Sequence, residues 1–260
     1  MKKCLKGKIS PLLKQYQIDN PTETWEQFKN GHPQGYNRVQ KRLRQNQGNL
    51  CCYCEIDLKQ GYGIGKDDFR VEHFHPKSSK KNSHNWALDW QNMLGCCHGG
   101  TEKYVTESQN RFIENKNERH SDALKGNFDW DNEILNPLEI PAFPILFKAN
   151  RRDGSLSVLE DNCRNAGIDI RKANNCLDAK KLNLNSAVLN RQRKKTLDAL
   201  NQQIQDKLSI GMTIEQAMIS VTESQLRKNQ EGHCPAFFTT IRSYLGKIAE
   251  EHLKTMGYQG

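Results

Sequence analysis

Four short groups of residues between positions 51 and 127 have the types and spacing that bind metal ions or move protons. The first is a C-x-x-C pair, Cys51 and Cys54, and two thiolates at this spacing can hold one tetrahedral Zn²⁺ from a tight turn. Cys97 is the natural third ligand, but Gly100 stands where a second C-x-x-C pair needs its cysteine. The spacing therefore leaves the fourth ligand open among Cys96, His98 and His120.

The second group joins an acid to a histidine, Glu72 and His73, in a predicted short strand over residues 69–74. A neutral imidazole can take a proton from water near pH 7, and an adjacent carboxylate can hold a hard divalent cation. Together such groups supply a nucleophile and an electrophile for phosphodiester hydrolysis. Asn92, expected on the next strand, can orient His73 through a side-chain hydrogen bond. Asp122, expected on a following helix, can complete the metal site.

Each of these groups has a simpler explanation when it is taken alone. A histidine beside an acid is more often a surface residue, an asparagine such as Asn92 is more often a turn residue, and a C-x-x-C pair can be a thiol redox site. The redox interpretation is disfavoured because no thioredoxin-like βαβ pattern surrounds Cys51 and Cys54. What favours the chemical interpretation is the order in which the groups follow one another.

The charge of the chain favours a polyanionic partner. Its 260 residues carry a formal net charge of +9, and residues 1–50 hold ten Lys or Arg against three acids. A second basic run lies at 191–195. A solvated surface explains either run equally well, so the charge makes nucleic acid a plausible partner without proving it.

The cysteines and the absence of long apolar segments indicate the compartment. Five of the nine cysteines fall in two tight clusters, which favours metal binding or catalysis over a disulfide framework. No run of about 18 apolar residues is present, which excludes a membrane span and a membrane partner. The basic N-terminus lacks the apolar stretch of a secretory signal, so we expect a cytoplasmic protein.

The elements that must position these groups belong to three predicted segments. Residues 1–50 form a basic helical segment, residues 51–135 hold the four groups, and residues 136–260 are a mostly helical region that begins with a proline-rich linker. Apolar residues recur at helical spacing over 183–208, and a last helix is predicted over 237–256. Core packing is the simpler explanation of these stripes, and a docking groove for a partner protein is the alternative.

Local signals add detail to this division. Thr22 or Thr24 can cap a helix that continues through Phe28, and Thr213 with Gln216 fits a capping box. Two short strands are predicted on either side of a turn at residues 153–154. The sequence as a whole predicts an α+β fold.

The order of the four groups resembles the HNH nuclease superfamily, a ββα-metal fold that a structural zinc often stabilises. The matching motifs cover about residues 48–127. They are C-x-Y-C-E from Cys51, Glu72-His73-x-x-Pro76-Lys77-Ser78, and Asn92-Met93-Leu94-x-x-Cys97. A longer pattern is similar to the PtuB-like nuclease subunits of Septu and retron-associated anti-phage systems. It adds Trp90-Gln-Asn-Met-Leu, Asp122-x-x-Lys125-Gly126-Asn127, Asn136-Pro137 and Leu182-Asn-Leu-Asn185.

The resemblance implies a ββα-metal module with a zinc knuckle, flanked by N-terminal helices and a mostly helical C-terminal part. His73 would be the general base, Asn92 the middle residue of the motif, and Glu72 and Asp122 ligands of a catalytic Mg²⁺ or Mn²⁺. Structural Zn²⁺ would be bound by Cys51, Cys54 and Cys97.

One residue departs from the family pattern. The family often has a cysteine where this chain has Ser121, and a neutral serine hydroxyl is a poor zinc ligand beside a thiolate. Either His120, His98 or Cys96 takes its place, or the zinc site is weak or absent. We name His120 first among these candidates and leave the identity of the fourth ligand open.

The resemblance also implies partners. Nucleic acid, either DNA or tRNA, would enter a basic cleft lined by residues such as Lys77 and Lys125. A PtuA-like ATPase would dock on the helical C-terminal region of this effector of an anti-phage complex, and a retron reverse transcriptase with its RNA–DNA is a further expected partner. The main alternative is a non-catalytic zinc-ribbon nucleic-acid-binding or adaptor subunit, which needs neither Glu72, His73 nor Asp122.

Overall fold

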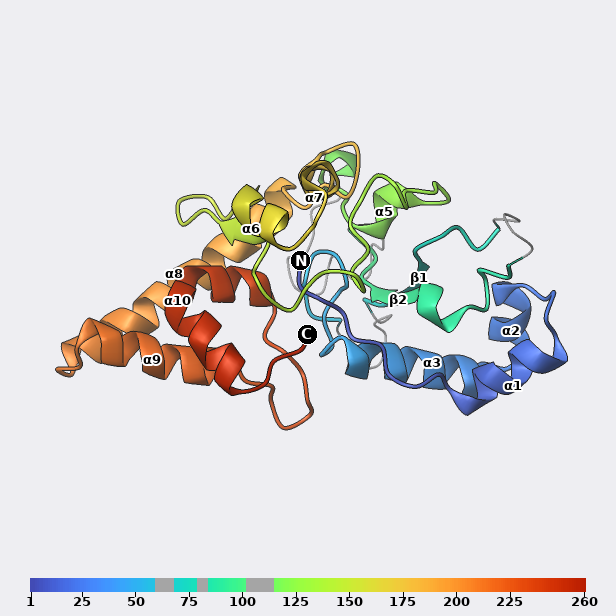
Figure 1. The fold of residues 1–260 in the computed structure, drawn as a ribbon, viewed down its shortest axis with the longest axis horizontal. Helices are drawn as coiled ribbons and strands as arrows, with labels where there is room; N and C mark the ends of the chain where they lie inside the picture. The colour runs from blue at the N-terminus through green and yellow to red at the C-terminus, as the bar shows by residue number, and fades with distance from the viewer. Residues whose placement is uncertain (59–67, 79–83, 102–114) are drawn as a thin grey trace.

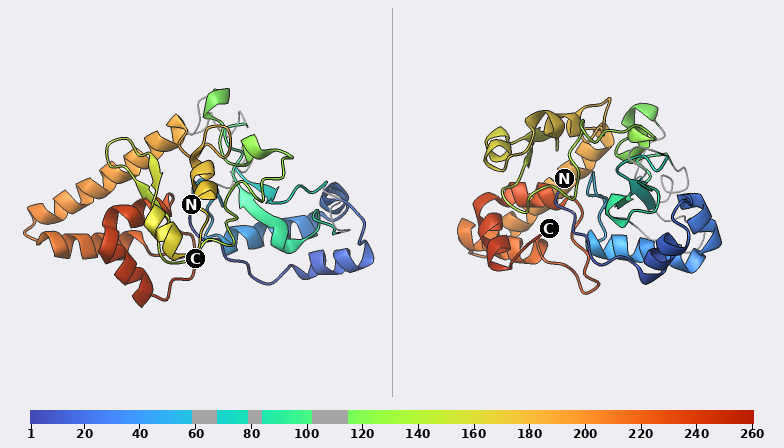
Figure 2. Two further views of the ribbon diagram at one scale, coloured as in Figure 1. Left: turned by 45° about the horizontal axis from the view of Figure 1, so that its top comes forward. Right: turned by 45° about the vertical axis from the view of Figure 1, so that its right-hand side comes forward.

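The structure, a computed structural model, describes residues 1–58, 68–78, 84–101 and 115–260 (Figure 1). These residues form α helices and two small antiparallel sheets, which confirms the predicted α+β class. In the views of Figures 1 and 2 the N-terminal helices lie at one end of the molecule and the pair of helices α8 and α9 at the other.

Three helices make up the N-terminal end: α1 (Pro11–Asp19), α2 (Trp25–Gly31) and α3 (Pro33–Asn46). Helix α2 begins with a capping box, in which the Thr24 side chain accepts from the Gln27 backbone N–H and the Gln27 side chain accepts from the Thr24 N–H. This confirms Thr24 as the cap and removes Thr22 from that role. Val39 and Leu43 form the buried stripe of α3.

A small hairpin and a one-turn helix form the centre of the molecule. Strands β1 (Arg70–His73) and β2 (Met93–Cys96) pair antiparallel, and α5 (Asp122–Lys125) packs beside them. Two 3-10 turns, η2 (Trp90–Asn92) and η3 (Lys116–Glu118), precede β2 and α5. Gly95 lets the Phe69 ring pack closely against β2, because a Cβ at this position would lie only 2.8 Å from that ring.

The C-terminal region is mostly helical, as predicted. Helices α8, α9 and α10 pack on one another, α10 also packs on β3, and α7 packs on β4. Thr213 and Gln216 form the capping box expected at the start of α9. The elements are β3 (Phe147–Ala149), β4 (Leu156–Val158), α6 (Glu160–Asn165), α7 (Ile170–Leu177), α8 (Ala187–Ser209), α9 (Ile214–Gln225) and α10 (Phe238–Thr255).

The buried core crosses both predicted segment boundaries. One cluster of buried side chains contains Phe28, Tyr53 and Leu189, one from each segment. Backbone hydrogen bonds also link the segments, from Phe237 N to Glu55 O and from Ser121 N to Leu182 O, both at 2.8 Å. The three segments therefore share a core. No helix among the described residues is long and apolar enough to cross a membrane.

Candidate active site and metal centre

The β1–β2 hairpin places the two chemical groups at its opposite ends. His73 lies opposite Met93 at one end, and Arg70 lies opposite Cys96 at the other. The acid–histidine pair is thus separated from the cysteines by the length of a four-residue strand. Helix α5 packs alongside this hairpin and contacts both of its ends.

His73 is buried, and its ring is held from two sides. Its Nε2 lies 3.0 Å from the carbonyl oxygen of Ala87, and the ring meets the Trp25 ring edge-on with 5.1 Å between centroids. Because a carbonyl oxygen only accepts hydrogen bonds, Nε2 carries the proton of the neutral ring and Nδ1 keeps its lone pair. Burial lowers the pKa of His73 to about 4. The ring is therefore neutral at pH 7, and Nδ1 can accept a proton.

The side chain of Asn92 fixes the backbone around His73. Its Nδ2 donates to the carbonyl oxygens of His75 and Trp86, both at 2.9 Å, and its Oδ1 accepts from the His75 N–H at 2.7 Å. Trp86 directly precedes Ala87, whose carbonyl oxygen accepts from the His73 ring. This corrects two expectations: Asn92 lies in η2, one residue before β2, and its amide acts on His73 through the backbone.

Glu72 and Asp122 come together where β1 meets α5, and each carboxylate has its own cation. Glu72 Oε1 lies 3.0 Å from Lys125 Nζ and accepts from the Tyr53 hydroxyl at 3.1 Å. Asp122 Oδ2 lies 2.5 Å from Arg70 Nε. Burial, followed by the neighbouring Asp122 carboxylate, raises the pKa of Glu72 well above its usual value. Two buried carboxyl groups that repel each other are a donor set that a hard divalent ion stabilises.

The two lysines that we expect to contact nucleic acid, Lys77 and Lys125, have different surroundings. Lys125 is completely buried, and its Nζ also donates to the His73 carbonyl oxygen at 3.0 Å. It therefore holds the site together and cannot meet a phosphate, which corrects the expectation for this residue. Lys77 is at the surface, where its Nζ lies 2.5 Å from Glu26 Oε1.

The cysteines of the knuckle meet those of β2 in one buried cluster. The turn over residues 51–56 closes through a hydrogen bond from Cys51 N to Ile56 O, and Cys52 N donates to Gly95 O of β2 at 3.0 Å. These two bonds place the knuckle against the end of β2, where Cys96 and Cys97 stand. All five thiols of the cluster are buried.

The three predicted thiol ligands lie at metal-binding distances. The sulfurs of Cys51, Cys54 and Cys97 are all within 4.8 Å of one another, and Cys54 Sγ lies 3.6 Å from Cys97 Sγ. Tetrahedral Zn²⁺ with Zn–S bonds of about 2.3 Å separates its sulfurs by about 3.8 Å. The cysteine cluster can therefore bind a metal ion.

The imidazole of His120 lies beside Cys97, one of these thiols. Its Nε2 lies 3.9 Å from Cys97 Sγ, against about 3.6 Å for a sulfur and a nitrogen on one tetrahedral zinc. Its Nδ1 lies 3.1 Å from Glu118 O, which only accepts, so Nε2 carries the lone pair toward the thiols. Gly99 makes room for this placement, because a Cβ there would lie 2.1 Å from the His120 carbonyl oxygen.

The thiols of the cluster differ in the direction in which their pKa values are shifted. Burial raises the pKa of the thiols of Cys52, Cys54 and Cys96 well above the usual value. Burial acts on Cys51 as well, but hydrogen bonds from the surrounding thiols outweigh it and hold the pKa of Cys51 well below the usual value. The Ser121 hydroxyl, where the family often has a cysteine, lies 4.0 Å from Cys51 Sγ. Cys51 is thus the thiol that these contacts favour as a thiolate.

The sequence patterns did not indicate several residues that belong to this site. Arg70 was detectable, because residues two apart on a strand share a face, and Arg70 therefore lies beside Glu72. Tyr53 sits inside the C-x-x-C pair, and nothing in its position signals a bond to Glu72. Ala87 contributes only a carbonyl oxygen, which every residue type has.

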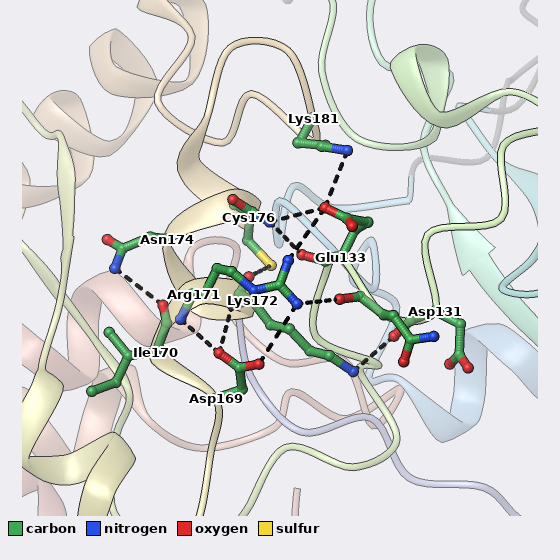
Figure 3. Close-up of polar contacts among 11 residues, drawn as sticks. Asp131, Glu133, Asp169, Ile170, Arg171, Lys172, Asn174, Cys176 and Lys181 are labelled. Carbon is green, nitrogen blue, oxygen red and sulfur yellow. Dashed lines mark hydrogen bonds and ion pairs between the residues drawn. The ribbon is translucent and has the colours of Figure 1, made fainter.

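A second group of polar side chains flanks the candidate site. Asp129 Oδ1 lies 3.6 Å from His75 Nδ1, and Asp131 Oδ1 lies 3.8 Å from His75 Nε2. Figure 3 shows how α7 anchors the segment that carries these acids: Lys172 Nζ donates to Asp131 O at 2.8 Å. The same helix and the turn after it hold the segment through contacts among Arg171, Asn175, Lys181, Asn132 and Glu133.

Comparison with known proteins decides the family. Over 218 residues, which are 77% of this chain and 81% of the relative, the sequence is 33% identical to a candidate HNH endonuclease of retron Ec83 from Escherichia coli. The chain belongs to the retron HNH endonuclease family. No protein-family model matches it. The predicted resemblance to HNH endonucleases with a retron association is confirmed, whereas the link to Septu systems stays a prediction.

Proposed function

We propose that this chain is a metal-dependent endonuclease that hydrolyses phosphodiester bonds of nucleic acid through a ββα-metal centre built from β1, β2 and α5. The observation that carries the proposal is the state of His73: a buried neutral imidazole whose Nε2 is bonded to Ala87 O, beside a crowded pair of carboxylates. A retron HNH endonuclease as relative supports the same reaction.

His73 would act as the general base. Its Nδ1 takes a proton from water, which then attacks phosphorus in line with the leaving oxygen. The hydrogen bond to Ala87 O stabilises the imidazolium that forms, because Nε2–H becomes a stronger donor when the ring is charged. Asn92 is the positioning residue that keeps this carbonyl group in place through Trp86 O.

Glu72 and Asp122 would hold a divalent cation, Mg²⁺ or Mn²⁺. The fit rests on the meeting of the two carboxyl groups, where burial and then the Asp122 charge raise the pKa of Glu72 although each carboxylate is also paired with a cation. When bound, such an ion neutralises charge on the phosphate and its leaving oxygen. The pairs with Arg70 and Lys125 hold the carboxylates in place.

Cys51, Cys54, Cys97 and His120 would hold a structural Zn²⁺. The three thiols form a buried group of metal-ligand geometry, His120 Nε2 lies 3.9 Å from Cys97 Sγ, and the Glu118 carbonyl fixes the His120 tautomer. The ion would join the knuckle to β2 and to the segment before α5. It would thereby stabilise one end of the hairpin, opposite the end that presents His73.

We propose further that the chain is the effector subunit of an anti-phage complex, with an ATPase partner bound to the tip of the α8–α9 pair. Exposed apolar side chains gather near this tip, at Ile210, Ile214 and Ile219. A pocket beside them is lined by Met212, Gln216 and Glu223. A retron reverse transcriptase is the other expected partner.

A cleavage assay tests the proposed reaction. The purified full-length chain, alone and with its partners, is incubated with plasmid DNA and with total tRNA in Mg²⁺, Mn²⁺ or EDTA. Cleavage of either substrate that needs the divalent ion supports the proposal and identifies the substrate. Binding of nucleic acid with no cleavage in either ion supports the alternative of a non-catalytic zinc-ribbon subunit.

A further inference from the structure

The cysteine cluster contains a second group of metal-ligand geometry. The sulfurs of Cys51, Cys52 and Cys96 are all within 4.8 Å of one another, and Cys51 Sγ lies 3.6 Å from Cys96 Sγ. All three side chains are buried. This group shares Cys51 with the group of Cys51, Cys54 and Cys97 described above.

One ion cannot use all five thiols. Two thiolates on one zinc are at most about 4.6 Å apart, since each Zn–S bond is about 2.3 Å. The five sulfurs form two groups of three, and within each group all sulfurs lie within 4.8 Å of one another, which is close to this limit. They do not form a single group of five with such distances. A single ion bound to Cys54 and Cys97 therefore leaves Cys52 and Cys96 without a metal, although both lie in a buried cluster around Cys51.

We propose that the cluster holds two Zn²⁺ ions, with Cys51 as the thiolate that bridges them. The first ion is bound by Cys51, Cys54, Cys97 and His120. The second is bound by Cys51, Cys52 and Cys96. The inference rests on the zinc site of the proposed function and is independent of the proposed cleavage chemistry.

The simpler explanation is that Cys52 and Cys96 are small apolar core residues. The two explanations differ in metal content. The test measures zinc per chain by elemental analysis in the full-length protein, purified under reducing conditions and freed of loosely bound metal by gel filtration. The proposal expects two zinc ions per chain, and one zinc ion per chain overturns it. No zinc at all would overturn the first site as well.

Variants assign the second ion to its ligands. Cys52→Ala and Cys96→Ala should each reduce the content from two ions to one while the circular dichroism spectrum is retained. Cys176→Ala, a buried cysteine on α7 outside the cluster, is the matched control and should keep two. Two ions retained in both cluster variants would overturn the assignment. If either variant fails to fold, the zinc content of the wild-type chain still decides.

A spectroscopic measurement tests the bridge itself. After exchange with ¹¹³Cd²⁺, a shared Cys51 thiolate should give two cadmium resonances that are scalar-coupled to each other. Two resonances without coupling would overturn the bridging role of Cys51, and a single resonance would overturn the second site. Neither outcome depends on nuclease activity, so failure here is distinguishable from failure of the proposed function.

Discussion

At the scale of single residues, the function depends on which nitrogen of His73 holds the proton. The sequence predicts the acid–histidine pair, because Glu72 and His73 are adjacent and have types that suit the chemistry. The proton position depends on Ala87 O, a backbone atom 14 residues along the chain. Residue types alone cannot indicate such a partner, so this part of the site required the structure.

The two lysines expected at the nucleic acid should respond differently to loss of charge. Lys125→Met removes the partner of buried Glu72, and we expect a loss of about 3–5 kcal/mol of unfolding free energy. Lys77→Met removes an exposed pair with Glu26, worth about 0–1 kcal/mol, and should instead weaken nucleic-acid binding. Chemical denaturation and a binding titration measure the two effects. A Lys125 variant as stable as wild type would contradict its structural role.

At the scale of elements, the segment before α5 positions His120 through a close contact with Gly99. Gly99 has φ +58°, and an added Cβ would lie 2.1 Å from His120 O. Gly99→Ala should therefore displace His120 and weaken zinc binding by about 10- to 100-fold. The rate of zinc release to a chromogenic chelator measures this effect.

Gly167→Ala is the matched control for that change. Gly167 also has a positive φ, +67°, but nothing lies within 4 Å of an added Cβ. Both variants carry the backbone strain of a left-handed residue, about 1–2 kcal/mol. Only the Gly99 variant should release zinc faster, and equal release from both would show that His120 is not a ligand.

Elements with strong local signals were the predictable part of the fold. The capping boxes at Thr24 and Thr213 and the apolar stripe of α8 are set by neighbouring residues, so the sequence shows them. Helices α6 and α7 have only six and eight residues, too few for an apolar pattern to repeat over several turns, and they were not predicted. The position of Asn92 in η2 depends on the turn that its own side chain makes with His75 and Trp86.

At the scale of the whole molecule, the shared core predicts one cooperative unit. Buried side chains of residues 1–50, 51–135 and 136–260 belong to the same cluster. We therefore expect a single unfolding transition in calorimetry, with a calorimetric enthalpy equal to the van't Hoff enthalpy. Two separate transitions would show that the segments fold independently. Sequence patterns locate changes of composition, and these do not reveal which segments share a core.

The proposed partner surface is tested by surface changes, because deletion of the C-terminal region would remove part of this core. Ile214→Asp places a charge on the exposed tip of α9 and should reduce co-purification with the ATPase partner at least about tenfold. Ile18→Asp on α1, which is similarly exposed, is the control. Both variants should keep the cleavage rate of the isolated chain. Unchanged co-purification of the Ile214 variant would place the partner elsewhere.

The central claim is that a neutral imidazole at His73 activates water for cleavage of nucleic acid. Single-turnover cleavage by His73→Ala, compared with wild type and with His84→Ala as a surface-histidine control, tests it most directly. We expect the His73 variant to be slower by about 10²–10⁴-fold, with its circular dichroism spectrum and zinc content retained, and the His84 variant to cleave at the wild-type rate. Cleavage by the folded His73 variant at the wild-type rate would contradict the account.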